Sequence, residues 1–183
     1  MAKVLIINSS TRKRSNSRIL AARVAEGAAQ QGHSVKTIEI GRAKLQPCLA
    51  CGSCQKNPGT CVIKDEMVGF YTDLTEADIL VFSSPISFYS INSQMKIFLD
   101  RTYPLVPRIY RNKRIGGVFT YGDIDPLRSG AINAIRMFQD FGNGGHIGVK
   151  WVGAVHGSLA GQGEAENASE LLNAAEEFGK TLV

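Results

Sequence analysis

The stretch Lys3-Val-Leu-Ile-Ile-Asn8, followed by Ser9-Ser-Thr-Arg-Lys-Arg-Ser-Asn-Ser17, decides the fold of this chain. The first part predicts a buried strand, because it is an unbroken apolar run from Val4 to Ile7. The second part is rich in hydroxyl groups and leads into a helix predicted over Arg18–Gln31, which Gly32 ends. A buried strand, a polar loop and a helix in this order are typical of an α/β protein with a parallel sheet.

The rest of the chain repeats this alternation. Further strands are predicted over Ser34–Ile40, Asp78–Ser84, Ile115–Thr120 and Ile147–Val155, and further helices over Asp65–Glu76, Ser93–Tyr103, Leu127–Asp140 and Glu164–Leu182. Pro85 is expected to end the third strand, because it cannot donate a ladder hydrogen bond. Five such units predict a doubly wound, flavodoxin-like five-stranded parallel sheet in the order 2-1-3-4-5, with Ser34–Ile40 at an edge. We expect a single domain over residues 1–183, with a cysteine-rich loop at 41–64.

Composition narrows the function classes. Hydrophobic residues make up 44% and charged residues 20% of the 183-residue chain, as in an ordinary soluble globular protein. The apolar runs are too short to cross a bilayer, and the first twenty residues lack the apolar stretch of a signal peptide, so we expect a cytoplasmic protein without a membrane partner.

The net charge of +5 comes largely from two basic clusters, Arg12–Arg14 and the residues Arg101, Arg108, Arg111, Lys113 and Arg114. A solvated basic face is the simplest interpretation. Attraction of a phosphate-bearing cofactor or of an acidic electron-transfer partner is the functional one. No groove-reading motif accompanies the clusters, so we expect no nucleic-acid partner.

The loop after the first strand contains no glycine, which argues against a standard dinucleotide-binding turn and against an NTPase P-loop. Its hydroxyl groups, together with the amides of a helix N-terminus, suit a terminal phosphate monoester, and Arg12 could add a charge-assisted contact. A polar loop that merely caps the helix is the alternative. The position favours phosphate binding, because ligands of this fold class bind at the switch point beyond the carboxyl ends of the strands.

Two further loops lie at that edge. After the third strand, Phe88 and Tyr89 stand side by side in a loop, where a planar flavin ring, a neighbouring helix or a dimer interface could cover them. After the fourth strand, Gly122 permits close backbone approach, and amides there could bond the polar edge of an isoalloxazine ring.

All four cysteines, Cys48, Cys51, Cys54 and Cys61, fall within fourteen residues with the spacing C-x2-C-x2-C-x6-C. Compact runs of this kind hold iron–sulfur clusters. In a reducing compartment, clustered thiols favour metal or redox chemistry over structural disulfides. A zinc site, a dithiol/disulfide redox pair and metal-free reduced thiols stay open as alternatives. His33, His146 and His156 are scattered and have no ligand spacing to the cysteines.

Two motifs and the cysteine run resemble those of one family. The chain is similar to the NADPH-dependent FMN reductase group of flavodoxin-like proteins, and within it to the iron–sulfur flavoproteins. The family pattern Asn-Gly-Ser-Pro-Arg-x-x-Gly-Asn-Thr/Ser is matched by Asn8, Ser10, Arg12, Asn16 and Ser17, with Ser9, Thr11 and Ser15 as departures. A second pattern is matched by Ser84, Pro85, Ser90, Gln94, Lys96, Asp100 and Arg101, whereas Ser87 replaces the usual tyrosine.

The resemblance implies an FMN-dependent oxidoreductase. The phosphate would lie on the first loop and the ring across the other two, at Ser10, Arg12, Asn16, Ser17, Pro85, Ile86, Ser87, Phe88, Tyr89, Ser90, Thr120, Tyr121 and Gly122. The four cysteines would hold a [4Fe–4S] cluster. Electrons would pass from NAD(P)H or a ferredoxin-like donor through FMN to a small acceptor, in a homodimer or homotetramer. No residue is singled out as an acid or base, because the cofactor carries this chemistry.

Two alternatives accompany this reading. The first is a cluster-free NAD(P)H:FMN or quinone reductase. The second is a flavodoxin-like electron carrier without turnover.

Overall fold

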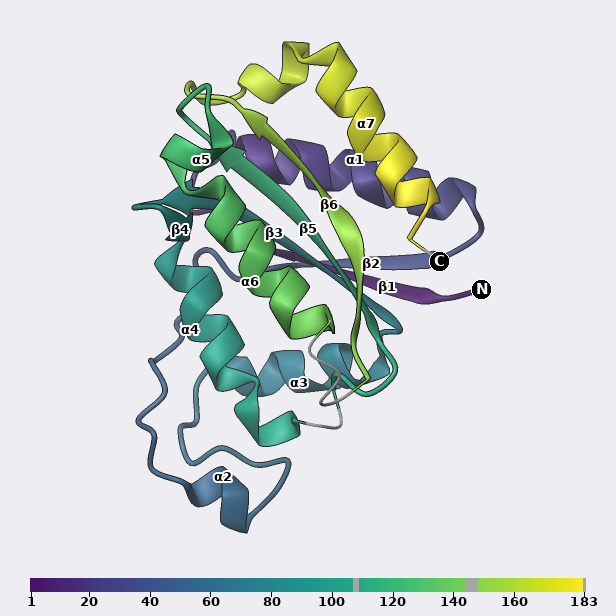
Figure 1. The fold of residues 1–183 in the computed structure, drawn as a ribbon. Helices are drawn as coiled ribbons and strands as arrows, with labels where there is room; N and C mark the ends of the chain where they lie inside the picture. The colour runs from purple at the N-terminus through teal and green to yellow at the C-terminus, as the bar shows by residue number, and fades with distance from the viewer. Residues whose placement is uncertain (107–108, 144–147, 183) are drawn as a thin grey trace.

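The computed structural model describes residues 1–106, 109–143 and 148–182 (Figure 1). The strands are β1 (Lys3–Asn8), β2 (Ser34–Glu39), β3 (Ile79–Ser87), β4 (Ser90–Ile91), β5 (Arg114–Tyr121) and β6 (Lys150–Ser158). The α-helices are α1 (Asn16–Gln30), α2 (Ser53–Lys56), α3 (Met67–Glu76), α4 (Ser93–Arg101), α5 (Pro126–Ser129), α6 (Ala131–Asn143) and α7 (Ser169–Lys180). Two 3-10 turns, η1 (Tyr103–Leu105) and η2 (Glu164–Asn167), complete the elements.

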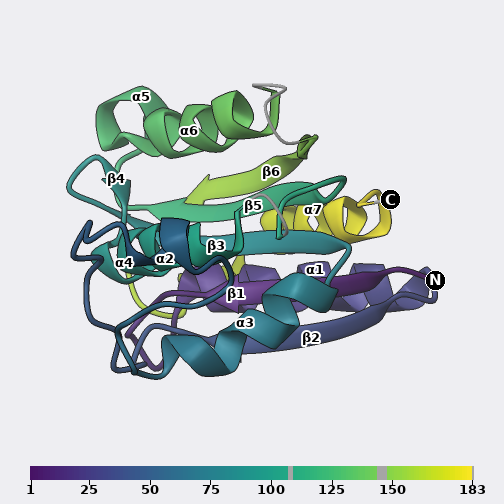
Figure 2. The same cartoon turned by 90° about the horizontal axis from the view of Figure 1, so that it is seen from below.

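Five parallel strands form the sheet in the order β2-β1-β3-β5-β6. Counting the long strands along the chain, this is 2-1-3-4-5, so the predicted order is confirmed and β2 lies at the edge as expected. Figure 2 shows the strands from β6 at the top to β2 at the bottom. The short strand β4 lies off this path and pairs antiparallel with the end of β3.

Helices cover both faces of the sheet, and alternate residues of β1 point to opposite faces. Leu5 and Ile7 join a core with α3, α4 and α6, whereas Val4 and Ile6 join a core with α1 and α7. All of these side chains are buried. Because both faces of β1 are buried, its sequence is a continuous apolar run rather than an alternation of apolar and polar residues. No helix in the described part of the chain is long and apolar enough to span a bilayer.

The expected strand end at Pro85 is wrong, because β3 continues to Ser87. The carbonyl of Ser83 accepts a hydrogen bond from Ser9 N on the β1 side, so the backbone nitrogen of Pro85, two residues further on, faces the same side. There β1 has already ended, since its last pair is Asn8 with Ser83. The missing N–H of Pro85 therefore removes no ladder hydrogen bond, and the strand continues beside Thr120 of β5.

Several helix boundaries also differ from the prediction. The helix expected over Leu127–Asp140 is divided into α5 and α6 by Gly130, whose φ of +80° no helix accommodates. The helix expected over Glu164–Leu182 begins as η2 before α7. The loop predicted at 41–64 contains the short helix α2. The predicted strand Ile147–Val155 is β6, and Ile147 itself lies outside the described residues.

The second basic cluster does not form one solvated face. Arg101 and Lys113 are buried, and Arg108 lies outside the described residues. The ammonium of Lys113 donates to the carbonyl oxygens of Thr75 (2.8 Å) and Ala77, so it closes the C-terminal end of α3, and burial lowers its pKa. Neither of these two buried cations therefore contributes to an exposed basic surface.

Candidate functional site at the carboxyl edge of the sheet

The first loop, residues 9–15, is fastened beneath the end of β3. The backbone N–H and the hydroxyl of Ser9 both donate to the carbonyl oxygen of Ser83, each at 3.0 Å. Ser10 is buried next to it, and its hydroxyl accepts from the N–H of Arg12 at 3.4 Å. The loop thus begins as a fixed turn at the switch point between β1 and β3.

Arg18 forms hydrogen bonds to three backbone carbonyl groups of this loop. Its guanidinium donates to the backbone oxygens of Ser10 (3.1 Å), Arg12 (2.9 Å) and Lys13 (3.1 Å), and it pairs with the Glu39 carboxylate at 2.8 Å. Turning these carbonyls toward α1 keeps negative partial charge away from the opposite side of the loop. The sequence alone does not reveal this role, although Arg18 opens the predicted helix.

The N-terminus of α1 lies at the end of the same loop. Ser15 is the N-cap, and its hydroxyl accepts from Arg18 N at 3.3 Å. The structure gives the backbone N–H groups of Asn16 and Ser17 no acceptor among the residues it describes. Free first-turn amides and a helix dipole favour an anion at this position.

The four residues predicted to bind the phosphate, Ser10, Arg12, Asn16 and Ser17, differ in burial and in hydrogen bonding. Ser10 is buried in the loop and Ser17 is buried in the first turn of α1, where its hydroxyl lies 3.1 Å from that of Ser15. Arg12 is exposed. The Asn16 amide donates to the carbonyl oxygens of Leu159 (3.1 Å) and Gly161 (2.7 Å) and accepts from Ala165 N at 3.2 Å. Asn16 therefore fastens the loop after β6, and a ligand would meet its backbone N–H rather than its engaged side chain.

The second loop is a β-hairpin rather than an irregular loop. Ile86 pairs with Ile91 and Ser87 with Ser90, so Phe88 and Tyr89 form a two-residue turn with φ of 48° and 66°. Aromatic residues adopt positive φ at a cost of about 1–3 kcal/mol each, so the surrounding structure must impose this turn. Phe88 is 95% exposed and Tyr89 is 61% exposed, so no neighbouring helix covers these residues within the described structure.

Asn92 connects the first loop to the second. Its side chain caps α4 by accepting from Met95 N at 3.2 Å and donates to the carbonyl oxygen of Ser9 at 2.8 Å. Its backbone N–H donates to the hydroxyl of Ser84 at 3.1 Å. Asn92 is therefore the N-cap of α4, and the same residue fixes the spacing of the two loops.

The third loop begins with Thr120 and Tyr121, which are both buried, and Gly122, which is exposed. The Tyr121 hydroxyl lies 3.1 Å from Nδ1 of His156 on β6. Burial lowers the pKa of His156, and burial and the nearby Asp125 carboxylate raise the pKa of Tyr121. A neutral imidazole accepting from a protonated phenol is the pairing that both directions favour.

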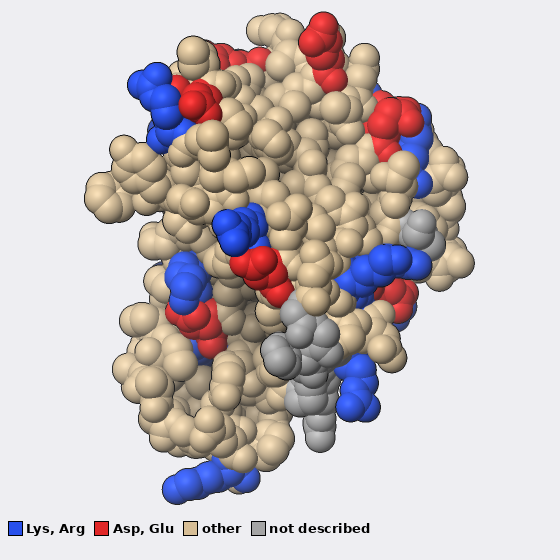
Figure 3. All heavy atoms as spheres, in the orientation of Figure 1, with Lys and Arg blue, Asp and Glu red and all other residues tan. Residues whose placement is uncertain are grey.

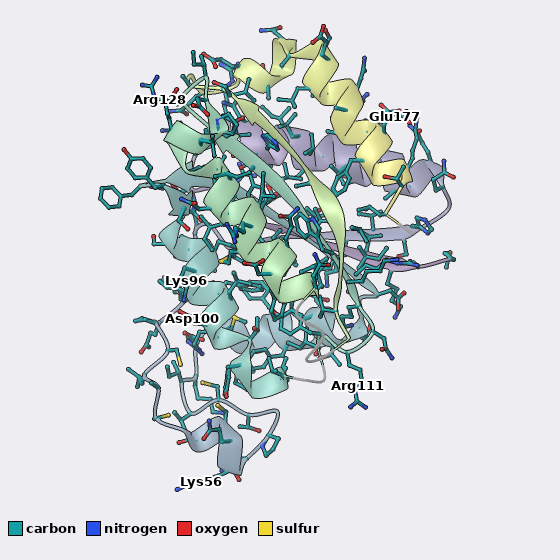
Figure 4. All side chains as sticks on the ribbon, viewed as in Figure 1. Lys56, Lys96, Asp100, Arg111, Arg128 and Glu177 are labelled. Carbon is teal, nitrogen blue, oxygen red and sulfur yellow. The ribbon has the colours of Figure 1, made fainter. Side chains whose placement is uncertain are left out.

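The four cysteines lie away from these loops, at the other end of α4. All of them line one cavity of about 750 Å³ between the cysteine segment (residues 41–64), α4 with η1, and α6. The nine residues of α4 span about 13 Å, and the cavity contacts this helix from Lys96 onward. Figure 1 shows α2, in this segment, hanging below α3 and α4, and Figure 4 labels Lys56 at its tip.

The four thiols differ in exposure and are not grouped around one point. Cys48 and Cys51 are exposed, Cys54 and Cys61 are half-buried, and all four are free. The Cys51 sulfur lies 3.4 Å from the Ser53 hydroxyl, and hydrogen bonds from the Ser53 side chain and backbone to the thiolate lower the pKa of this thiol. In the described part of the chain, no three His, Cys, Asp or Glu side chains are grouped to hold a metal ion. The donor chemistry suits iron or zinc, but the thiols as placed here do not fit one centre.

A doubly wound sheet with polar loops at its carboxyl edge defines an α/β protein of the flavodoxin-like class. The chain belongs to the NADPH-dependent FMN reductase family, whose sequence pattern matches residues 2–172.

Two relatives of this chain have names that state a function. An iron–sulfur flavoprotein of Methanocaldococcus jannaschii is 29% identical over 120 residues, which cover 66% of this chain and 62% of that protein. An NAD(P)H dehydrogenase (quinone) of Archaeoglobus fulgidus is 30% identical over 128 residues, which cover 68% of this chain and 63% of that protein. The chain therefore spans about three fifths of the length of these relatives.

Solved structures agree on the fold. An NAD(P)H:quinone oxidoreductase from Methanothermobacter marburgensis superposes with a TM-score of 0.74 at 16% identity, covering 100% of this chain and 99% of that one. A flavodoxin from the domain Archaea superposes with a TM-score of 0.62 at 15% identity, covering 98% of this chain and 95% of that one. At these identities the likeness shows the fold alone, and it is the fold that the sequence predicts.

Proposed function

We propose that the protein is an FMN-dependent oxidoreductase whose flavin phosphate binds at the N-terminus of α1. FMN supplies the redox chemistry when it is bound, and the chain's own residues bind and orient it. The main support for the proposal comes from the first loop. There Arg18 donates hydrogen bonds to three backbone carbonyl oxygens, and the first-turn amides of α1 have no acceptor among the described residues. The family supports FMN as the ligand that uses this anion site.

The ring is proposed to lie across the other two loops. The contacts would come from Pro85, Ile86, Ser87, Phe88, Tyr89 and Ser90 of the hairpin and from Thr120, Tyr121 and Gly122. Exposed aromatic side chains on a fixed turn offer a flat apolar surface to a planar ring. Exposed backbone at Gly122 offers hydrogen bonds to its polar edge.

The phosphate site is tested by comparing FMN with riboflavin, which lacks the phosphate. Flavin fluorescence quenching should give a Kd for FMN about 100-fold lower than for riboflavin, or about 2.8 kcal/mol. Arg12→Gln should weaken FMN by about fivefold and leave riboflavin unchanged, because only the phosphate meets the lost charge. Lys36→Gln, on the far strand β2, is the matched control. Equal affinities for the two flavins in the native protein would exclude a phosphate site.

We further propose that electrons come from NAD(P)H or a ferredoxin-like donor and go to a small acceptor such as a quinone. The name NAD(P)H dehydrogenase (quinone) of one relative supports NAD(P)H as the donor and a quinone as the acceptor. Anaerobic reduction of the FMN-loaded protein with NADH, NADPH or reduced ferredoxin identifies the donor. Turnover with a quinone separates an enzyme from an electron carrier, which would be reduced but would not turn over.

A [4Fe–4S] cluster on Cys48, Cys51, Cys54 and Cys61 is the second part of the proposal. Four thiols on one cavity and relatives named iron–sulfur flavoproteins support it, and the thiols would have to draw together on loading. Iron and acid-labile sulfide are measured on protein purified without oxygen, with about four of each per chain expected. Absence of iron would leave zinc ligands, a redox pair or reduced thiols, and a cluster-free NAD(P)H:FMN or quinone reductase.

The remaining parts of the proposal concern organisation. We place residues 1–183 in one FMN-binding domain, in the reducing cytoplasm, and assembled as a homodimer or homotetramer. Free thiols support the compartment, and the exposed side chains of Phe88, Ile124 and Leu127 support an interface between copies. Light scattering after size-exclusion chromatography measures the assembly, and a monomer at all concentrations would contradict it.

A further inference from the structure

Among the residues that the structure describes, Arg101 is the largest fully buried side chain, with 1% of its surface exposed. It forms a bidentate ion pair with Asp65, with N–O distances of 2.7 and 2.9 Å. The Asp65 side chain is also buried, with 6% of its surface exposed. Neither charge lies at the carboxyl edge, and the proposed flavin chemistry uses neither. A buried ion pair is weak support for stability as such, so a specific positional role is the more informative explanation.

The guanidinium also binds both ends of the stretch that carries the cysteines. One nitrogen donates to the carbonyl oxygen of Gln46 at 2.7 Å, and the other donates to that of Ile63 at 3.3 Å. Gln46 lies two residues before Cys48, and Ile63 lies two residues after Cys61. Asp65 completes the closure by accepting from Gln46 N at 2.8 Å.

The other tethers of this stretch come from the residues that follow Arg101. Gly59 N donates to the carbonyl oxygen of Pro104 at 2.8 Å, and the Gln55 amide donates to the Tyr103 hydroxyl at 3.4 Å. No residue from 47 to 62 belongs to either hydrophobic core. The thiols are therefore held in place by the end of α4 and by η1 rather than by apolar packing.

We propose that Arg101 is a positioning residue that closes the base of the cysteine segment and sets the four thiols around their cavity. A guanidinium suits this role, because its planar fork reaches a carboxylate and two carbonyl oxygens at once, which an ammonium cannot do. At its other end α4 is fixed by Asn92 to the first loop, so one short helix positions both the thiols and, if the proposed function holds, the flavin cradle.

The test uses two rates that report on the segment itself. Lys56 is the only Lys or Arg between Lys44 and Lys64, so tryptic cleavage after Lys56 measures opening of the segment. The reaction of the half-buried thiols of Cys54 and Cys61 with Ellman's reagent measures the same opening chemically. In Arg101→Lys, both rates should rise about tenfold or more, because the charge stays but the fork is lost.

A second variant guards against simple unfolding. Arg101→Met combined with Asp65→Leu removes both charges, a change that buried ion pairs often tolerate. We expect this variant to keep its far-UV circular dichroism and its FMN affinity within about twofold, while both opening rates rise as in Arg101→Lys. Arg111→Gln, an exposed arginine labelled in Figure 4, is the matched control and should leave all values unchanged.

Two results would overturn the proposal. Native opening rates in Arg101→Lys and in the double variant would show that other contacts hold the segment. Loss of the circular dichroism signal in the double variant would show that the pair supports the whole fold. Both rates are measured without flavin, so a native protein that fails to bind FMN refutes the proposed function and leaves this test intact.

Discussion

Arg18 and Asn92 shape the carboxyl edge through the carbonyl groups that they bind. Arg18 turns three carbonyls of the first loop toward α1, and Asn92 holds the Ser9 carbonyl against the start of α4. A residue that orients the backbone in this way gives no sequence signal of its own, because its partners are main-chain atoms. The signal was limited to position: Arg18 opens a helix and Asn92 caps one.

Gly130 offers a test of how the hairpin is held. It has a φ of +80°, and an added methyl group would collide with the backbone of Tyr89, whose carbonyl accepts from the Asn133 amide at 3.3 Å. Gly130→Ala should therefore lower the free energy of unfolding by about 1–3 kcal/mol, measured by urea denaturation. Gly69→Ala, in the open first turns of α3, is the control and should raise it by about 0.5–1 kcal/mol. A loss of the same size in both variants would contradict the collision.

His156 gives a pH prediction. Burial lowers the pKa of His156 in the folded state below the ordinary value of about 6.5. At pH values between these two pKa values, the unfolded chain therefore binds more protons than the folded chain. The stability associated with the neutral ring is thus complete above pH 6.5 and is lost as the pH falls through the folded pKa. Urea unfolding at pH 5.5 and 7.5 should show a smaller difference in His156→Asn than in the native protein. An unchanged difference would assign the pH dependence to other groups.

At the scale of elements, the contact between α1 and α7 depends on two glycines. A methyl group at Gly27 would collide with the carbonyl oxygen of Glu176, and one at Gly179 with that of Val24. Gly27→Ala and Gly179→Ala should each lower the free energy of unfolding by about 1–3 kcal/mol, because two backbones in contact cannot move apart locally. The change is measured as a lower midpoint of urea unfolding. Gly69→Ala again serves as the control for helix propensity. Unchanged midpoints would show that the helices separate without cost.

The elements show how far the sequence predicts this fold. The strands, their order and most helices followed from apolar runs and helical spacing, since these patterns report on burial. The extension of β3 through Pro85 could not be predicted, because it depends on where the neighbouring strand β1 ends. The hairpin at Phe88 and Tyr89 was missed for a related reason: its turn lacks the Asn-Gly or Gly residues that signal positive φ.

The candidate site also has features that the sequence predicts and features that only the folded chain shows. Hydroxyl groups before a helix indicated an anion-binding loop, but the engaged amide of Asn16 and the role of Arg18 needed the folded chain. Spacing placed four thiols in one segment, yet it could not place them relative to each other. Arg101 was grouped with surface cations, because its partner Asp65 is 36 residues away and sequence proximity does not reveal such a pair.

At the scale of the whole molecule, we expect residues 47–62 of the cysteine segment to be separable from the core. Replacing residues 47–62 with Gly-Ser-Gly should leave the FMN affinity within about threefold and the unfolding midpoint near the native value, because none of these residues packs in a core. Fluorescence titration and urea denaturation measure the two quantities. A variant in which all four cysteines become serine is the control for the thiols alone. A shortened chain that no longer folds would refute separability.

The surface of that segment has a consequence for encounters with other molecules. Between residues 47 and 62 only Lys56 is charged, and the corresponding part of Figure 3 is almost uniformly tan. Long-range fields, which accelerate association at low salt, have little to act on there. A molecule that meets the protein through this face would therefore do so at a rate nearly independent of ionic strength. The anion site at the N-terminus of α1, beside Arg12, Lys13 and Arg14, would capture its ligand faster in dilute buffer than in concentrated salt.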